Sequence, residues 1–89
     1  MPDEISLARA IEILEAAFAP FRCVAEAWDY DKKVRFRVFD AADEPLLTFP
    51  SIVWRSVSNL DRLSTLISEA RRRLESEGMA LDTWSMPLR

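Results

Sequence analysis

Arginines that alternate with aromatic residues are the side chains of this sequence best suited to binding. Two neighbouring segments carry them, and the residues are Arg22, Trp28, Arg35 and Arg37. Guanidinium groups interleaved with aromatic rings on a sheet can hold an anionic small ligand or single-stranded nucleic acid. The same side chains could instead satisfy one another, because Glu26 could pair with Arg35 or Arg37, and an arginine could lie against the tryptophan ring. Both interpretations stay open, although the net charge of −3 disfavours nucleic acid as a partner.

A second candidate surface is apolar, and its residues are Ile52, Trp54, Trp84 and Met86. Three tryptophans in 89 residues is a high number, and tryptophan is enriched where proteins bury surface against a partner. The segment at 79–89 is too apolar for a solvated tail, so it should pack on its own chain or on another one. We therefore expect these residues either to complete the core or to bind a partner protein, which could be a second copy of the chain.

Most catalytic chemistry is excluded by residue types that the sequence lacks. There is no histidine to act as a general base near neutral pH, and one cysteine without histidine cannot form a zinc-type site. The single glycine, Gly78, cannot form a phosphate-binding loop. An enzyme would have to use Tyr30 or an acidic cluster whose spacing fits no known cation-binding loop and is typical of a turn. That cluster is Asp40, Asp43 and Glu44. We expect no catalytic residue, no metal and no cofactor.

Two further features have simple structural interpretations. Cys23 falls on the inward side of a strand pattern, which predicts a small buried hydrophobic residue rather than a reactive thiol. The basic run at residues 71–73 lies four residues from glutamates on both sides, which predicts solvated ion pairs along a helix. The run also lies in the last turns of that helix, where positive charge complements the helix dipole.

Hydrophobic periodicity predicts two helices and three strands. Apolar residues recur every three or four positions in two segments and every second position in the strand segments between them. A polar turn at 40–45 precedes the third, short strand. In order, the predicted elements are a helix at 5–19, strands at 21–29, 33–40 and 46–49, and a helix at 59–77. Residues 51–56 either continue the third strand past a bulge or cross toward the last helix.

Capping and breaking residues predict where these elements begin and end. Asp3 or Ser6 can cap the first helix. Pro50 cannot donate a hydrogen bond within a sheet, so the third strand should lie at an edge or end there. Ser58 is the expected cap of the last helix, because Asp61 follows it three residues later in the capping-box position.

The predicted elements combine into an α+β fold of order α-β-β-β-α, which forms a single domain over residues 1–89. Its three-stranded antiparallel sheet should carry both helices on one face, because the apolar stripes of the helices have nothing else to cover. The buried face of the sheet is expected to consist of Cys23, Ala25, Val34, Phe36 and Val38.

Cysteine usage and hydropathy predict a cytoplasmic protein that does not enter a membrane. One cysteine forms no intrachain disulfide, the N-terminus lacks the pattern of a signal peptide, and no apolar stretch reaches the length of a membrane span. We expect a small, non-catalytic protein-interaction module, such as a regulator, adaptor or inhibitor, that could form a homodimer. The alternative is a binding module for an anionic small ligand or single-stranded nucleic acid on the arginine-lined sheet face.

Two short motifs resemble a known family. Phe18, Pro20 and Cys23 fit a Phe-x-Pro-x-x-Cys motif, and the Arg-Val-Phe-Asp run at 37–40 fits a strand motif. With the order of the elements, these motifs are similar to small bacterial proteins catalogued as domain of unknown function 1652, over roughly residues 5–75. The resemblance implies the same element order and a bacterial, cytoplasmic origin. It implies no activity, ligand or catalytic residue.

Overall fold

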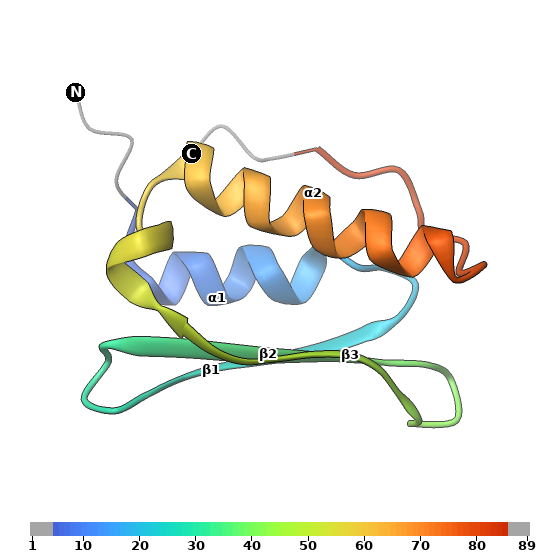
Figure 1. Ribbon diagram of the computed structural model, residues 1–89, viewed down its shortest axis with the longest axis horizontal. Coiled ribbons are helices and arrows are strands. Elements are labelled where there is room, and N and C mark those ends of the chain that lie inside the picture. The colour runs from blue at the N-terminus through green and yellow to red at the C-terminus, as the bar shows by residue number, and fades with distance from the viewer. Residues whose placement is uncertain (1–4, 86–89) are drawn as a thin grey trace.

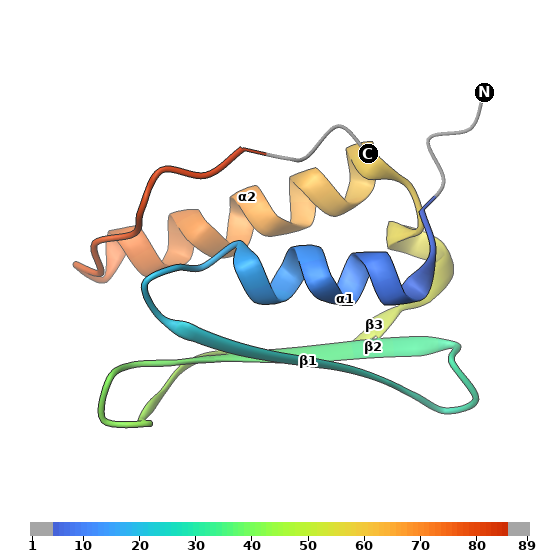
Figure 2. The same cartoon turned by 180° about the vertical axis from the view of Figure 1, so that it is seen from behind.

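The computed structural model describes residues 5–85 and shows a three-stranded antiparallel sheet with two helices on one of its faces (Figure 1). The opposite view shows both helices on the same side again, so the other face of the sheet is uncovered (Figure 2). The predicted α-β-β-β-α order is confirmed. The elements are α1 (Leu7–Ala16), β1 (Arg22–Trp28), β2 (Lys33–Phe39), β3 (Pro45–Val53), the short 3-10 helix η1 (Trp54–Val57) and α2 (Leu60–Ser76).

Helix α1 begins at a side-chain cap and ends before a proline. The Ser6 hydroxyl accepts a hydrogen bond from the Arg9 backbone N–H at 3.1 Å, so Ser6 is the cap of the two candidates that lies within the described residues. Asp3 lies outside them. Beyond the helix, Ala17 and Phe18 are fully buried, and Pro20 leads the chain into β1.

Strand β2 is the centre of the sheet, and its side chains alternate between the two faces. The pairing sets Cys23 opposite Val38 and Ala25 opposite Phe36 on the buried face. The turn between β1 and β2 contains no glycine, yet Asp29, Tyr30 and Asp31 all have positive φ angles. Aspartate tolerates this conformation better than tyrosine does, and Tyr30 is 94% exposed at the tip.

Strand β3 is longer than the sequence predicts, because it runs through Pro50 to Val53 instead of ending at residue 49. It lies at the edge of the sheet, as expected for a strand with an internal proline. On a free edge, the missing N–H of proline removes no ladder hydrogen bond, so the strand can continue. The pairing with β2 is irregular between Val34 and Phe36. Of the two alternatives for residues 51–56, the strand therefore continues first, and η1 then leads to α2.

The cap of α2 differs from the prediction. Asn59, not Ser58, occupies the N-cap, and its side-chain oxygen accepts from the Arg62 backbone N–H at 2.9 Å. The reason is that η1 extends the preceding turn to Val57, so Ser58 closes η1 and its hydroxyl donates to the Arg55 carbonyl. Asparagine is as good a cap as serine. No helix among residues 5–85 is long and apolar enough to cross a bilayer.

The core lies between the helices and the sheet. Phe36 is at its centre, with Phe18 stacked at 5.6 Å between ring centroids and Phe49 at 4.8 Å. Aromatic pairs at these separations add stability beyond their buried area. The largest fully buried side chains are Phe18, Phe36, Leu14, Leu63, Ile67, Leu74, Val34 and Val38.

The segment after α2 folds back along that helix and packs on its own chain as far as residue 85 (Figure 1). Arg71 connects this tail to the end of α1. Its guanidinium donates to the carbonyls of Ala17 and Asp82, both at 2.7 Å, and the Asp82 N–H donates to the Ala19 carbonyl at 2.8 Å. The expectation of solvated glutamate pairs for Arg71 is therefore wrong. The Ala17 carbonyl lies at the C-terminal cap of α1, where no further helical N–H can reach it, and the Arg71 guanidinium supplies its donor.

Candidate functional site

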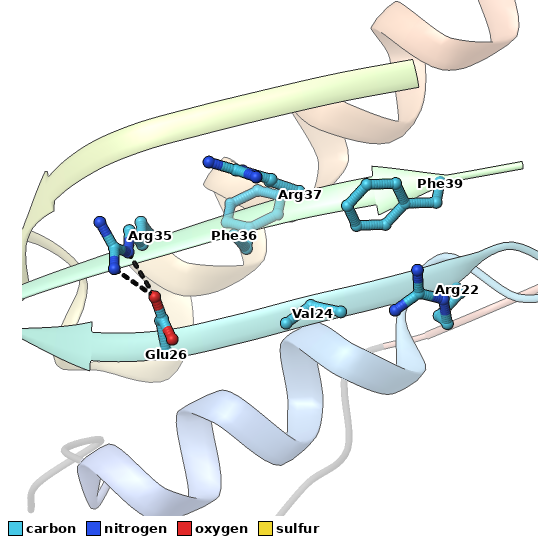
Figure 3. Close-up of a pocket in the computed structure, with 7 residues that line it drawn as sticks. All are labelled: Arg22, Val24, Glu26, Arg35, Phe36, Arg37 and Phe39. Carbon is cyan, nitrogen blue, oxygen red and sulfur yellow. Dashed lines mark hydrogen bonds and ion pairs between the residues drawn. The ribbon is translucent and has the colours of Figure 1, made fainter. Parts of the chain in front are cut away.

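The uncovered face of the sheet gathers the charged and aromatic side chains of β1 and β2. Every second residue of the two strands points to this face, and these residues are Arg22, Val24, Glu26, Trp28, Lys33, Arg35, Arg37 and Phe39. We call them the open face. Its centre is a shallow cavity of about 350 Å³ (Figure 3). The structure thus brings the predicted residues Arg22, Trp28, Arg35 and Arg37 onto one surface.

Two of the three arginines on the open face form ion pairs within the chain. Arg35 lies directly opposite Glu26, and its Nε donates to the Glu26 carboxylate at 2.6 Å (Figure 3). This is the cross-strand pair that the sequence predicts as one alternative. Arg22 pairs with Asp43 of the β2–β3 turn at 3.0 Å. All four side chains are about half exposed or more, so each pair contributes little to stability and can exchange partners.

Arg37 differs from its neighbours, because its guanidinium has no ion pair or hydrogen bond with any residue in the described range 5–85. It lies in the middle of β2, opposite Val24 on β1 and Thr48 on β3. Of the cations on the open face, Lys33 also has a carboxylate partner, Asp29, at 3.8 Å. The centre of the face therefore carries a positive charge whose hydrogen-bond donors are available to a ligand.

The aromatic rings of the open face are covered by cations. The Arg22 guanidinium lies 4.5 Å from the centroid of Phe39. Lys33 and Arg35 lie 5.0 Å and 5.5 Å from the Trp28 ring. These are the cation–π contacts that the sequence allows. A nucleic-acid base needs a free ring face on which to stack, so the arrangement favours ionic contacts over base stacking.

The predicted apolar partner surface is only partly available. Ile52, Trp54 and Trp84 are half-buried and pack against the core, while Met86 lies outside the described residues. Trp54 borders a second shallow cavity of about 400 Å³ beside the β1–β2 turn. Trp84 instead lies in the tail, with its ring 6.0 Å from the guanidinium of Arg71 on α2. The structure therefore places the two tryptophans in different regions.

The acidic cluster between β2 and β3 stabilises a turn. One carboxylate oxygen of Asp40 accepts from the backbone N–H groups of Ala42 at 2.8 Å and Glu44 at 2.9 Å. Asp43 faces Arg22 instead. Within residues 5–85, no three acidic, histidine or cysteine side chains are grouped so that they could hold a metal ion.

Cys23 is buried on the inner face, where burial and the negative charge of Glu15 raise the pKa of its thiol to about 12. The thiol therefore stays protonated and unreactive near neutral pH. Its pKa in the folded state exceeds the ordinary thiol value of 9.0, so between about pH 9 and 12 the folded state keeps a proton that the unfolded chain loses. The contribution of Cys23 to stability is fully present below pH 9 and declines as the pH rises toward 12.

We expect two results from this burial. Native Cys23 should resist alkylation at pH 8, whereas the unfolded chain should react rapidly. The difference in unfolding free energy between the wild type and Cys23→Ala should shrink as the pH rises above 9, since only the wild type carries the thiol. Urea titrations across that range measure it. A pH-independent difference, or rapid alkylation of the folded protein, would contradict the buried, neutral thiol.

Some residues of the open face escaped the sequence-based choice. Val24 and Phe39 share the face, as the period of two predicts, although neither was among the candidate ligand residues. The contact of Asp43 with this face could not be predicted from a local pattern, because its partner Arg22 lies 21 residues away in the sequence. Tyr30, which an enzyme would have to use, lies in the turn between β1 and β2 and is outside both strands that form this face.

Comparison with known proteins identifies a family and nothing more specific. No curated protein matches the chain, and no solved structure matches it. A family model described as "Protein of unknown function (DUF1652)" matches residues 8–74, from the first turn of α1 almost to the end of α2. That span contains the open face and both motifs on which the resemblance depended. The chain belongs to the DUF1652 family of proteins of unknown function.

Proposed function

We propose that this protein is a small, non-catalytic protein-interaction module that binds its partner through the open face. The observation that carries the proposal is Arg37, an exposed guanidinium without a partner in the described chain, at the centre of an uncovered sheet face. Arginine is enriched at interfaces, where its fork of donors pairs with carboxylates. Val24 and Phe39 add apolar surface on either side.

The two edges of the sheet are poor docking sites, which favours the face. At β1, the outward Ala25 N–H donates to the carboxylate of Glu15 on α1 at 3.1 Å, so this edge is partly covered. At β3, Pro45 and Pro50 have no N–H to offer, and the pairing is irregular. Prolines and covering groups of this kind prevent strand addition. A partner that pairs as a fourth strand would therefore meet few free donors.

The apolar residues that the sequence offers as a partner surface are less suited to this role than the open face. Ile52, Trp54 and Trp84 already pack on their own chain, which reduces the area they can offer. A second copy of the chain is also a poor occupant of the open face, because a symmetric dimer would set the arginines of both copies against each other. The proposal includes a cytoplasmic location, which the lone thiol of Cys23 supports.

The second candidate function uses the same face to bind an anionic small ligand or single-stranded nucleic acid. The three arginines around the cavity support it. The covered faces of Trp28 and Phe39 and the net charge of −3 count against nucleic acid. We therefore place this candidate second.

Affinity capture from native lysate, with and without nuclease, tests the proposal. The immobilised proteins are the wild type, Arg37→Glu and the matched control Arg72→Glu, which changes another exposed arginine, on α2. We expect a protein partner that survives nuclease, is kept by the wild type and the control, and is lost from Arg37→Glu. A partner kept equally by all three proteins would place the interface elsewhere. Capture that disappears with nuclease would favour the second candidate.

A further inference from the structure

The arginines of the open face are evenly spaced. Arg35 and Arg37 are two residues apart on β2, which corresponds to about 6.6–6.8 Å along a strand. Arg22 on β1 lies opposite Phe39, so it is the diagonal neighbour of Arg37, at about 7–8 Å between backbone positions. The three side chains thus form a row that runs along β2 from Arg35 to Arg37 and then crosses diagonally to Arg22 on β1, in two steps of similar length.

An extended peptide presents side chains on one side with the same step, because its side chains alternate with a period of two. We propose that the open face binds an extended acidic segment of a partner protein that carries Asp or Glu at every second position, aligned along β2. This inference rests on the proposed function and names the chemistry of the partner. Each carboxylate would meet one guanidinium, a geometry in which two parallel hydrogen bonds can form.

The ion pairs on the face determine how the peptide would bind. Arg37 has no carboxylate partner among residues 5–85, so the first acidic residue gains a new contact there. At Arg22 and Arg35, the incoming carboxylates would replace Asp43 and Glu26, whose side chains are 73% and 52% exposed and return readily to water. The net gain is therefore concentrated at Arg37. Since all these charges are exposed, binding should weaken as salt is added.

Because cations cover the aromatic rings of the open face, the row of arginines is better suited to bind carboxylates than nucleotides. A nucleic-acid strand also carries regularly spaced negative charges, but much of its affinity for a sheet comes from bases stacked on aromatic faces. Arg22 covers Phe39, and Lys33 and Arg35 cover Trp28. A peptide needs no such platform, because its backbone and side chains can lie over Val24 and the cation-covered rings.

Fluorescence anisotropy with labelled synthetic peptides tests the inference. One peptide alternates Glu with Thr, a second has the same composition with all Glu in one block, and an oligothymidylate of equal charge is the nucleic-acid probe. We expect the wild type to bind the alternating peptide about fivefold more tightly than the block peptide. Arg37→Ala should weaken this binding about tenfold, as for the loss of one charge-assisted pair, and Arg72→Ala should leave it within about twofold. Thermal unfolding of each variant confirms that it is folded.

Equal affinity for the two peptides would overturn the inference, as would tighter binding of the oligothymidylate or equal effects of Arg37→Ala and Arg72→Ala. The capture experiment separates this failure from that of the proposed function. If capture of a nuclease-resistant partner depends on Arg37 but the alternating peptide does not bind, the protein is an interaction module whose partner is not an alternating acidic segment. If neither depends on Arg37, both proposals fail.

Discussion

Phe36→Ala is expected to lower the free energy of unfolding by about 3–5 kcal/mol, a large part of what a domain of this size has. Phe36 is 1% exposed, and its ring lies between those of Phe18 and Phe49. Truncation removes both aromatic contacts and leaves a cavity between the central strand and the helices, which the packed core can fill only partly. Urea titration followed by tryptophan fluorescence measures the change.

Phe39→Ala is the matched control for this prediction. Phe39 lies on the same strand three residues later, points to the open face and is only half-buried, with Arg22 over its ring. We expect it to cost about 1 kcal/mol or less, as for an exposed cation–π contact. Phe36→Leu should recover part of the loss, because it keeps an apolar side chain in the core. Similar costs for Phe36→Ala and Phe39→Ala would mean that the two faces of β2 have been assigned wrongly.

Arg71→Ala is expected to destabilise the protein by about 2–4 kcal/mol, because hydrogen bonds from a charged donor contribute roughly 1.5–3 kcal/mol each. The Arg71 guanidinium donates to the carbonyls of Ala17 and Asp82, and it is more buried than its neighbours in the basic run. Its loss leaves two carbonyls without donors and releases the tail from α1. Urea titration gives the free energy, and limited proteolysis reports whether residues 79–85 become accessible.

Two variants separate the contacts of Arg71 from its charge. Arg72→Ala removes the same charge from the next position, which is exposed, and should change stability by no more than about 0.5 kcal/mol. Arg71→Lys keeps the charge, but a single ammonium group cannot reach two carbonyls as a planar fork does, so it should fall between the wild type and alanine. If Arg71→Ala behaves like Arg72→Ala, the bridge between α1 and the tail does not stabilise the fold.

The sequence was sufficient for those parts of the structure that depend on local periodicity. The period of two along 33–40 identified both faces of β2, so it predicted the buried residues together with the outward Arg35 and Arg37. The same alternation offered Arg35 and Arg37 as partners of Glu26, and the register of the structure selects Arg35. The sequence was less decisive where two neighbouring residues could each cap a helix. The structure places the N-cap of α2 at Asn59 rather than Ser58. Pro50 was one reason to expect that the third strand ends near residue 49. The strand continues to Val53, because an edge strand can accommodate a proline.

Contacts between distant segments were beyond the reach of the sequence. The glutamates four residues from Arg71 fulfil the rule for helical ion pairs, and this rule could not anticipate a carbonyl 54 residues away. For the same reason the pairing of Arg22 with Asp43 was missed. So was the finding that, within the part of the chain that the structure describes, Arg37 is the one arginine of the three without a carboxylate partner. The open face was thus predictable as a set of residues, but its distribution of free and paired charge was not.

The contacts between the first and last parts of the chain affect how it is made. Ile5 donates to the Ser58 carbonyl, and Ala17 and Ala19 accept from Arg71 and Asp82. During synthesis, α1 and the β1–β2 hairpin therefore leave the ribosome before α2 and the segment after it, which pack on them, have been made. Until α2 emerges, part of the apolar inner face of the sheet lacks its cover on the nascent chain, where chaperones or aggregation compete with folding. Truncation from the C-terminus should thus impair the yield of folded protein at synthesis before it affects any binding to the open face.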